Sequence, residues 1–314
     1  MSLTRSDIRA AHERIATRVR RTPVLELAPG ELGHDGPVSL KLEFLQHAGS
    51  FKSRGAFNSL LSQPIPAAGV TAASGGNHGA AVAFAARELG VPARIFVPEI
   101  ASAAKIALIR RCGAEIVIGG ARYADAQAAC DAYAAASGAL LIHPFSATAT
   151  MAGQGTIGPE WDEQRPGLDT VLVAVGGGGL IGGIASWWAG SSTRVVGVEP
   201  EGSCALHAAL AAGGSVDVEV NSVAADSLGA RNVGDLVYAT CRGAVDHVAL
   251  VTDGAIRDAQ HRLWQDLRIA AEPGGAAALA ALLSGAYRPA PGERVGVLLC
   301  GANVDPRSLA EVAA

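Results

Sequence analysis

The chain has 314 residues, enough to bury a large hydrophobic core without disulfide or metal staples. Its 25 Lys and Arg residues nearly balance its 29 Asp and Glu residues, and the net charge of −4 argues against nucleic acids or acidic membrane surfaces as partners. A hydrophobic content of 49% with 17% charged residues excludes a disordered chain. The 39 glycines are an unusually large share and indicate that parts of the fold require backbone without side chains.

The first segment of the chain predicts a surface helix of a cytoplasmic protein. Ile8, Ala11, Ile15 and Val19 recur at helical spacing among charged residues, without the apolar core of a signal peptide. The five cysteines show no CxxC spacing. Neither a disulfide framework nor a zinc site is therefore indicated.

Beyond this helix, short β-branched runs alternate with alanine-rich stretches. The predicted strands cover residues 38–44, 69–74, 93–98, 115–119, 139–143, 170–175, 194–199, 246–251 and 294–300. The predicted helices cover residues 80–89, 103–111, 124–136, 180–189, 204–212, 254–267 and 275–283, and several end at a glycine such as Gly90 or Gly138. This alternation implies an α/β fold in which helices flank parallel sheets.

One uncharged stretch, residues 170–193, is long enough to span a bilayer. Seven of its residues are glycine, four of them consecutive. Because glycine disfavours a helix interior, we interpret the stretch as a buried strand, a glycine loop and a helix, and expect no association with a membrane.

Ligands of open parallel sheets bind where strands end and glycine loops lead into helices. Three such junctions directly follow apolar strands: SGGNHG at 74–79, GGGGLIGG at 176–183 and CGAN at 300–303. Gly176, Gly177, Gly178 and Gly179 offer consecutive unhindered N–H groups, which predicts a phosphate site. An alternative stays open, because Gly177, Gly179 and Gly182 with Glu199 also match a dinucleotide fingerprint.

Lys52, in the segment SFKSRGA, stands just before or within the first turn of a helix that we expect to begin near Arg54. The helix dipole disfavours a cation there, and a second cation follows two residues later. Positive surroundings and burial both lower the pKa of a lysine and favour a nucleophilic role. Taken alone, this position still favours an ordinary solvated lysine.

Taken together, the segments SFKSRGA, SGGNHG, GGGGLIGG, VEPEG, EPGGA and CGAN resemble the fold-type II pyridoxal-phosphate enzymes, in particular the threonine/serine dehydratase and serine racemase group. The segments keep the family order and extend from about Ser6 to Asp305. The resemblance implies two open, mostly parallel twisted sheets with flanking helices. It also implies a large cofactor-binding domain of residues 1–68 plus 146–314 and a small substrate-carboxylate-binding domain of residues 69–145, assembled as a homodimer.

The resemblance implies roles for individual residues. Lys52 matches the lysine that binds the cofactor covalently and later removes the substrate α-proton, and Phe51 the residue that packs on the pyridine ring. Asn77 matches the asparagine that hydrogen-bonds the cofactor 3-hydroxyl. The expected phosphate loop comprises Gly176, Gly177, Gly178, Gly179 and Leu180, and the expected substrate-carboxylate loop comprises Ser74, Gly75, Asn77 and His78. Cys300 lies where the family usually has serine or threonine at the pyridine nitrogen.

These residues predict an ammonia-lyase that dehydrates and deaminates a β-hydroxy amino acid such as L-threonine or L-serine to a 2-oxo acid and ammonia. A neutral thiol at the ring nitrogen does not enforce a pyridinium, which suits elimination. The alternatives are β-replacement or racemisation on the same cofactor, or a dinucleotide-binding regulatory protein that does not use Lys52.

The sequence departs from the racemases at two places. Their second acid/base is a serine at the position of Gly75, so we expect little or no direct racemisation. Their cation site pairs a glutamate at the position of Glu199 with an aspartate six residues later, where Ala205 stands here. We therefore expect no metal. Glu199 is a remnant of the cation site, a lone ligand or, the interpretation we favour slightly, an acid that ends a strand.

Two further positions carry open interpretations. Ser227 replaces a glycine that lies against the cofactor ring in the family, which bears on substrate size or pose. Glu272 matches a glutamate near the ring nitrogen, or favours the helix that follows Pro273 as an acid at its N-terminus.

Overall fold

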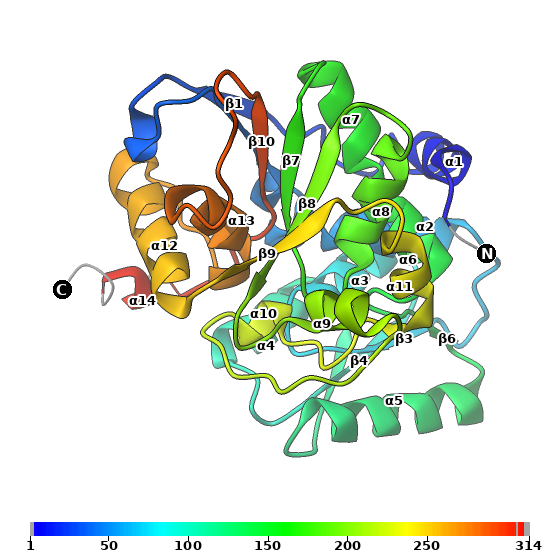
Figure 1. Cartoon of the computed structure of the whole chain (residues 1–314). Coiled ribbons are helices and arrows are strands. Elements are labelled where there is room, and N and C mark those ends of the chain that lie inside the picture. The colour runs from blue at the N-terminus through cyan, green and yellow to red at the C-terminus, as the bar shows by residue number, and fades with distance from the viewer. Residues whose placement is uncertain (1–2, 306, 311–314) are drawn as a thin grey trace.

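Figure 1 shows the computed structural model, which describes residues 3–305 and 307–310. Two sheets organise the chain. The larger has the strand order β1-β2-β10-β7-β8-β9, and the smaller has the order β5-β4-β3-β6. The strands are β1 (Val24–Leu27), β2 (Val38–Leu42), β3 (Val70–Ala73), β4 (Ala93–Val97), β5 (Glu115–Ile118), β6 (Leu140–Leu141), β7 (Thr170–Ala174), β8 (Arg194–Pro200), β9 (His247–Val251) and β10 (Val295–Leu299).

The α/β class with mostly parallel sheets is confirmed. Among the described strands, only β1 and β2 pair antiparallel, and the other neighbouring pairs are parallel. Each of the nine predicted strands is present. β1 was missed, because four residues after a proline at the antiparallel edge give little periodic signal.

The helices connect the strands and cover both faces of the sheets. They are α1 (Arg5–Ile15), α2 (Lys52–Leu61), α3 (Asn77–Glu88), α4 (Ala103–Arg111), α5 (Tyr123–Ser137), α6 (Thr148–Gly155), α7 (Ile157–Gln164), α8 (Gly179–Trp188), α9 (Ala205–Ala212), α10 (Ala225–Leu228), α11 (Gly234–Cys241), α12 (Asp253–Leu267), α13 (Pro273–Leu283) and α14 (Arg307–Ala310). In the large sheet, α13 packs on one face and α8 on the other; α3 and α5 both pack on the small sheet (Figure 1).

The strands at the centre of the large sheet are buried throughout because helices cover both faces. All five residues of β7 and all five of β10 are buried. The stretch 170–193 forms β7, the glycine loop and α8, as expected. Among the described residues, no helix is long and apolar enough to cross a bilayer.

A network of four charged side chains lies inside the large-sheet region. Arg54 of α2 donates to Glu43 at 2.7 Å and 2.8 Å and to Glu160 of α7 at 2.9 Å. Lys41 of β2 donates to Glu160 at 2.6 Å. All four residues are buried. The network therefore ties α2, which begins at Lys52, to β2 and α7 with two positive and two negative charges.

Candidate active site

Lys52 is the first residue of α2, two residues earlier than the helix start expected from the sequence. Its side chain is partly buried, and its Nζ donates to the carbonyl oxygen of Pro144 at 2.9 Å. Nζ also lies 5.2 Å from the centre of the Phe51 ring. Burial lowers the pKa of Lys52 to about 8, although Cys300 and Glu272 nearby act in the opposite direction. A substantial fraction of this amine is thus neutral near pH 8.

Of the two expected causes of a lowered Lys52 pKa, burial is confirmed, whereas the neighbouring cation Arg54 is not among the groups that shift it. The guanidinium of Arg54 turns away from Lys52 and is paired with Glu43 and Glu160 in the buried network. Desolvation of Lys52 itself, rather than repulsion from Arg54, lowers the pKa.

Phe51 and Cys300 lie next to each other where β10 meets the start of α2. The Phe51 N–H donates to the Cys300 carbonyl oxygen at 3.1 Å, and Ser50 pairs with Gly301 in an isolated antiparallel bridge. The Cys300 thiol donates to the carbonyl oxygen of Gly274 at 3.4 Å. Burial raises the pKa of this thiol far above its ordinary value, so Cys300 is neutral at physiological pH.

Asn77 begins α3 and joins both sheet regions. Its Nδ2 donates to Glu272 Oε1, and its Oδ1 accepts from Asn303 Nδ2 at 2.8 Å. Glu272 precedes α13 but makes no capping hydrogen bond to that helix. Glu272 thus stands at the N-terminus of α13, as one of its two interpretations expects, but its carboxylate accepts from Asn77 and does not cap the helix. Its Oε2 is buried without a hydrogen-bond partner among the described residues.

The segment between β3 and α3 forms a turn. Ser74 Oγ accepts from the Gly76 N–H at 3.2 Å, and Gly75 follows Ser74 without a side chain. His78 Nε2 lies 2.8 Å from the carbonyl oxygen of Ile142. Burial, assisted by Lys52, lowers the pKa of His78 to about 3. His78 is therefore a neutral imidazole that donates to Ile142 and is no ready proton donor at neutral pH.

The glycine loop enters α8 through Gly178, which has φ +79°. A Cβ atom at Gly177 would lie 2.3 Å from the Phe145 ring, and one at Gly176 would lie 2.9 Å from Leu228 Cα. Side chains at these positions would collide with their surroundings. Leu180 follows inside α8 and is buried. The loop thus presents backbone alone at the N-terminus of a helix, as the sequence predicted.

The segment His143–Phe145 joins Lys52 to the glycine loop, and no prediction singled it out. Pro144 accepts from Lys52, while the Phe145 ring packs against Gly177. His143 Nδ1 accepts from the N–H groups of Phe145 at 3.2 Å and Ser146 at 2.8 Å, which holds this turn. The one feature of the sequence that could have pointed to this segment is its position directly after the short strand β6.

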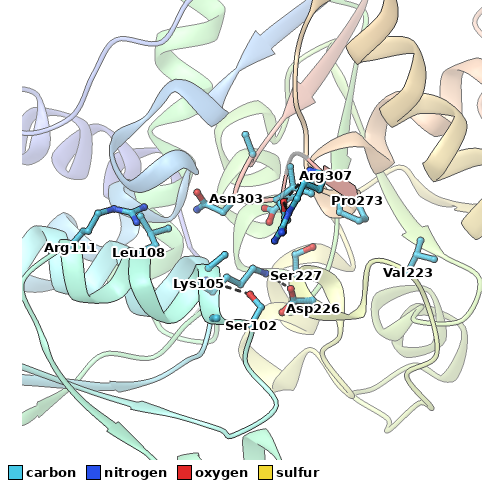
Figure 2. A pocket seen from close by; sticks show the side chains of 16 residues that line it. Ser102, Lys105, Leu108, Arg111, Val223, Asp226, Ser227, Pro273, Asn303 and Arg307 are labelled. Atoms are coloured by element: carbon cyan, nitrogen blue, oxygen red, sulfur yellow. Dashed lines mark hydrogen bonds and ion pairs between the residues drawn. The ribbon is translucent and has the colours of Figure 1, made fainter. Parts of the chain in front are cut away.

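A cavity of about 520 Å³ opens beside Glu272 and Asn303 (Figure 2). Lys105 of α4 lines this cavity, and its ammonium pairs with Asp226 of α10, which also lines it. Ser227 follows Asp226, and its hydroxyl lies close to Gly274. A Cβ atom on residue 274 would collide with this hydroxyl. Gly274 therefore makes room for the additional side chain of Ser227.

Glu199 lies at the end of β8 and points into the protein. Its two carboxylate oxygens accept from the N–H groups of Leu206 at 2.9 Å and His207 at 2.8 Å, at the N-terminus of α9. Burial raises its pKa to about 7. Within residues 3–305 and 307–310, no group of three or more His, Cys, Asp or Glu side chains is arranged to hold a metal ion. Glu199 is engaged with a helix terminus, as expected for an acid that ends a strand.

Most predicted site residues are thus joined in three contacts: Phe51 with Cys300, Asn77 with the EPGGA and CGAN segments, and Lys52 with the glycine loop through Pro144 and Phe145. Ser74, Gly75 and His78 share the β3–α3 junction with Asn77. Five of the six segments singled out by the sequence therefore meet where strands end and helices begin, whereas Glu199 of the VEPEG segment contacts α9.

Comparisons with known proteins agree with this arrangement. Residues 15–301 match the model of the family described as pyridoxal-phosphate dependent enzyme. The chain is 40% identical to phenylserine dehydratase of Ralstonia pickettii, covering 97% of this chain and 94% of the relative. It is 38% identical to L-threonine ammonia-lyase of Geobacter sulfurreducens, covering 97% and 77% of the two chains. The structure of maize serine racemase superposes with a TM-score of 0.92 at 36% identity, covering 100% of this chain and 97% of that one. The chain therefore belongs to the family of pyridoxal-phosphate-dependent enzymes.

Proposed function

We propose that this enzyme is an ammonia-lyase that converts a β-hydroxy amino acid, such as L-threonine or L-serine, to a 2-oxo acid and ammonia. The observation that carries the proposal is Lys52, whose partly buried amine has a pKa of about 8 and is linked through Pro144 and Phe145 to the glycine loop. The relatedness to a phenylserine dehydratase and to threonine ammonia-lyases supports the same reaction class.

The described residues fit pyridoxal phosphate. Lys52 supplies an amine for covalent attachment, with a pKa low enough to leave part of it unprotonated. The loop Gly176–Gly179 has no room for side chains and presents the N-terminus of α8, the kind of site that binds phosphate. Cys300 offers a neutral thiol, and Asn77 an amide, for the polar atoms of the ring. We propose that Phe51 and Leu180 complete these contacts.

When bound, pyridoxal phosphate withdraws electrons from the α-carbon of the substrate. In the proposed reaction, Ser74, Gly75, Asn77 and His78 hold the substrate carboxylate at the N-terminus of α3, where the helix dipole favours an anion. Lys52 takes the α-proton, and the β-hydroxyl leaves with a proton as water. The released enamine then takes up water, which gives the 2-oxo acid and ammonia. The neutral thiol of Cys300 does not enforce a ring cation, which suits this loss of the β-substituent.

We further propose that residues 69–145 form a small domain that closes over the substrate, with residues 1–68 and 146–314 as the large domain. Residues 1, 2, 306 and 311–314 lie outside the described part of the chain. The four strands of the smaller sheet all fall within residues 69–145, and the Lys105–Asp226 ion pair spans the two parts (Figure 2). Closure of this kind would exclude water from the reacting atoms.

Product analysis with L-serine and L-threonine tests the proposed reaction. We expect 2-oxo acid and ammonia in equal amounts, because each elimination releases one of each. We expect little D-enantiomer, because Gly75 has no proton to deliver to the opposite face of the substrate. The D-enantiomer is measured in the same samples by chiral chromatography, with and without a chelator. Racemisation that is faster than 2-oxo acid formation would contradict the proposal and favour the racemase alternative. Capture of the intermediate by an added thiol in place of its release would favour β-replacement.

We also propose that the enzyme acts in the cytoplasm as a homodimer. All five cysteines are unpaired, which is typical of a reducing compartment. The dimer is an expectation from the family resemblance.

A further inference from the structure

A chain of four hydrogen-bonding groups crosses the site from the turn before Lys52 to the start of α13. The Asn303 Nδ2 donates to the carbonyl oxygen of Ala48 at 2.7 Å and to Asn77 Oδ1 at 2.8 Å. Asn77 Nδ2 in turn donates to Glu272 Oε1. Asn303 closes the CGAN segment, and its side chain lies on the wall of the cavity (Figure 2).

The direction of this chain is set at Ala48. A backbone carbonyl can only accept, so the Asn303 atom that faces Ala48 must be the NH₂ group. That group has two hydrogens: one goes to Ala48, and the other must meet an acceptor. The Asn77 atom facing Asn303 is therefore Oδ1, because the opposite orientation would place two NH₂ groups against each other.

The rest of the Asn77 amide follows from this assignment. With Oδ1 held by Asn303, Nδ2 points toward Glu272 and uses one hydrogen there. The second hydrogen of Nδ2 is left for another acceptor. The side chain at the start of α3 thus has one N–H of fixed orientation available to a ligand in the site.

The turn that carries Ala48 is shaped for Asn303. Ala48 and Gly49 have φ values of +56° and +73°, in the left-handed region. A Cβ on residue 49 would lie 2.4 Å from Asn303 Oδ1, so only glycine leaves room for the asparagine. This turn directly precedes Ser50, Phe51 and Lys52, and its geometry is therefore coupled to the start of α2.

We propose that Asn303 is a positioning residue that fixes the orientation of the Asn77 amide, so that Asn77 presents an N–H to the 3-oxygen of pyridoxal phosphate. The inference rests on the proposed function of Asn77 as a cofactor ligand. Asn303 acts only through Asn77. An N–H donated to this oxygen stabilises its ionised form, and loss of the N–H favours the protonated form.

Binding of pyridoxal phosphate to Asn303→Asp tests this role, because aspartate keeps the shape of asparagine but replaces the NH₂ donor with an acceptor. We expect about tenfold weaker cofactor affinity, the effect of losing one buried hydrogen bond to an ionised group. We also expect the absorbance of the bound cofactor to move from its longer-wavelength band to its shorter-wavelength band. Asn232→Asp, at an exposed asparagine, is the matched control and should leave both unchanged.

The cycle with Asn77→Ala separates positioning from a general structural role. If Asn303 acts through Asn77, Asn303→Asp changes neither affinity nor spectrum further in the Asn77→Ala background. Asn303→Ala, which adds no charge, should shift the spectrum in the same direction and guards against unfolding of the aspartate variant. The inference would be overturned if both Asn303 variants kept the wild-type spectrum and affinity. It would also be overturned if Asn303→Asp had its full effect in the Asn77→Ala background. Failure of the proposed function would appear differently, as wild-type protein that binds the cofactor but releases no 2-oxo acid.

Discussion

Replacing Lys52 with alanine lowers kcat for 2-oxo acid release by about a thousandfold or more, the usual loss on removal of a positioned acid/base. The variant loses both the amine that attaches the cofactor and the base that takes the α-proton. Because Lys52 Nζ contacts only the Pro144 carbonyl as a hydrogen-bond partner among the described residues, we expect little change in folding. Initial rates with L-threonine and L-serine, measured with excess pyridoxal phosphate, give the comparison.

Lys52→Arg separates the chemistry from the charge. Arginine keeps a cation at the start of α2, but its pKa leaves no neutral amine for attachment or for proton removal. We therefore expect Lys52→Arg to be as inactive as Lys52→Ala, while thermal unfolding shows that both remain folded. Activity above a tenth of wild type in either variant would contradict the role assigned to Lys52.

Replacing Arg54 with methionine lowers the free energy of unfolding by about 3–5 kcal/mol, the typical cost of removing one partner from a buried ion pair. Glu43 loses its two hydrogen bonds from Arg54, and Glu160 keeps only Lys41 as a cationic partner. All four side chains are shielded from water, so solvent cannot replace the lost charge. Urea denaturation of the purified protein measures the difference.

The matched control is Arg87→Met, because Arg87 pairs with Glu88 at the surface and its side chain is 46% exposed. Surface ion pairs contribute little, so a change within about 0.5 kcal/mol is expected there. A loss below about 1 kcal/mol for Arg54→Met would show that the buried network does not stabilise α2. A loss as large for Arg87→Met would show that the method does not resolve the two environments.

The strands and most helices could be predicted because their signals are local. Apolar β-branched runs predict β7 and β10, and the glycines with positive φ at Gly90 and Gly138 end α3 and α5 as expected. α6 and α7 were missed because the glycines at 153, 155 and 158 are atypical of helices. Close packing between helices explains why glycines stand at these positions. A Cβ at Gly155 would lie 2.8 Å from the carbonyl oxygen of Gly183 in α8.

The candidate site also contains some residues that local patterns indicate and others that only tertiary contacts reveal. Lys52, the glycine loop and Cys300 stand in segments whose order and composition carry the family resemblance, whereas Pro144 and Phe145 act through contacts that no local pattern shows. The partners of Arg54 are distant in sequence, so the sequence did not show that its charge is paired with Glu43 and Glu160 and does not act on Lys52. Glu272 stands at the N-terminus of α13, which the sequence allowed, but its contact with Asn77 joins residues far apart in the chain and could not be predicted.

Reduction of the protein loaded with pyridoxal phosphate by borohydride, followed by peptide mass spectrometry, tests the central claim most directly. The chain has only three lysines, at positions 41, 52 and 105. Lys41 is buried in an ion pair with Glu160, and Lys105 forms an ion pair with Asp226. We predict that the reduced cofactor is found on the peptide containing Lys52 and on neither of the other two. Labelling of Lys41 or Lys105 in place of Lys52, or no stable label at all, would contradict this account of the active site.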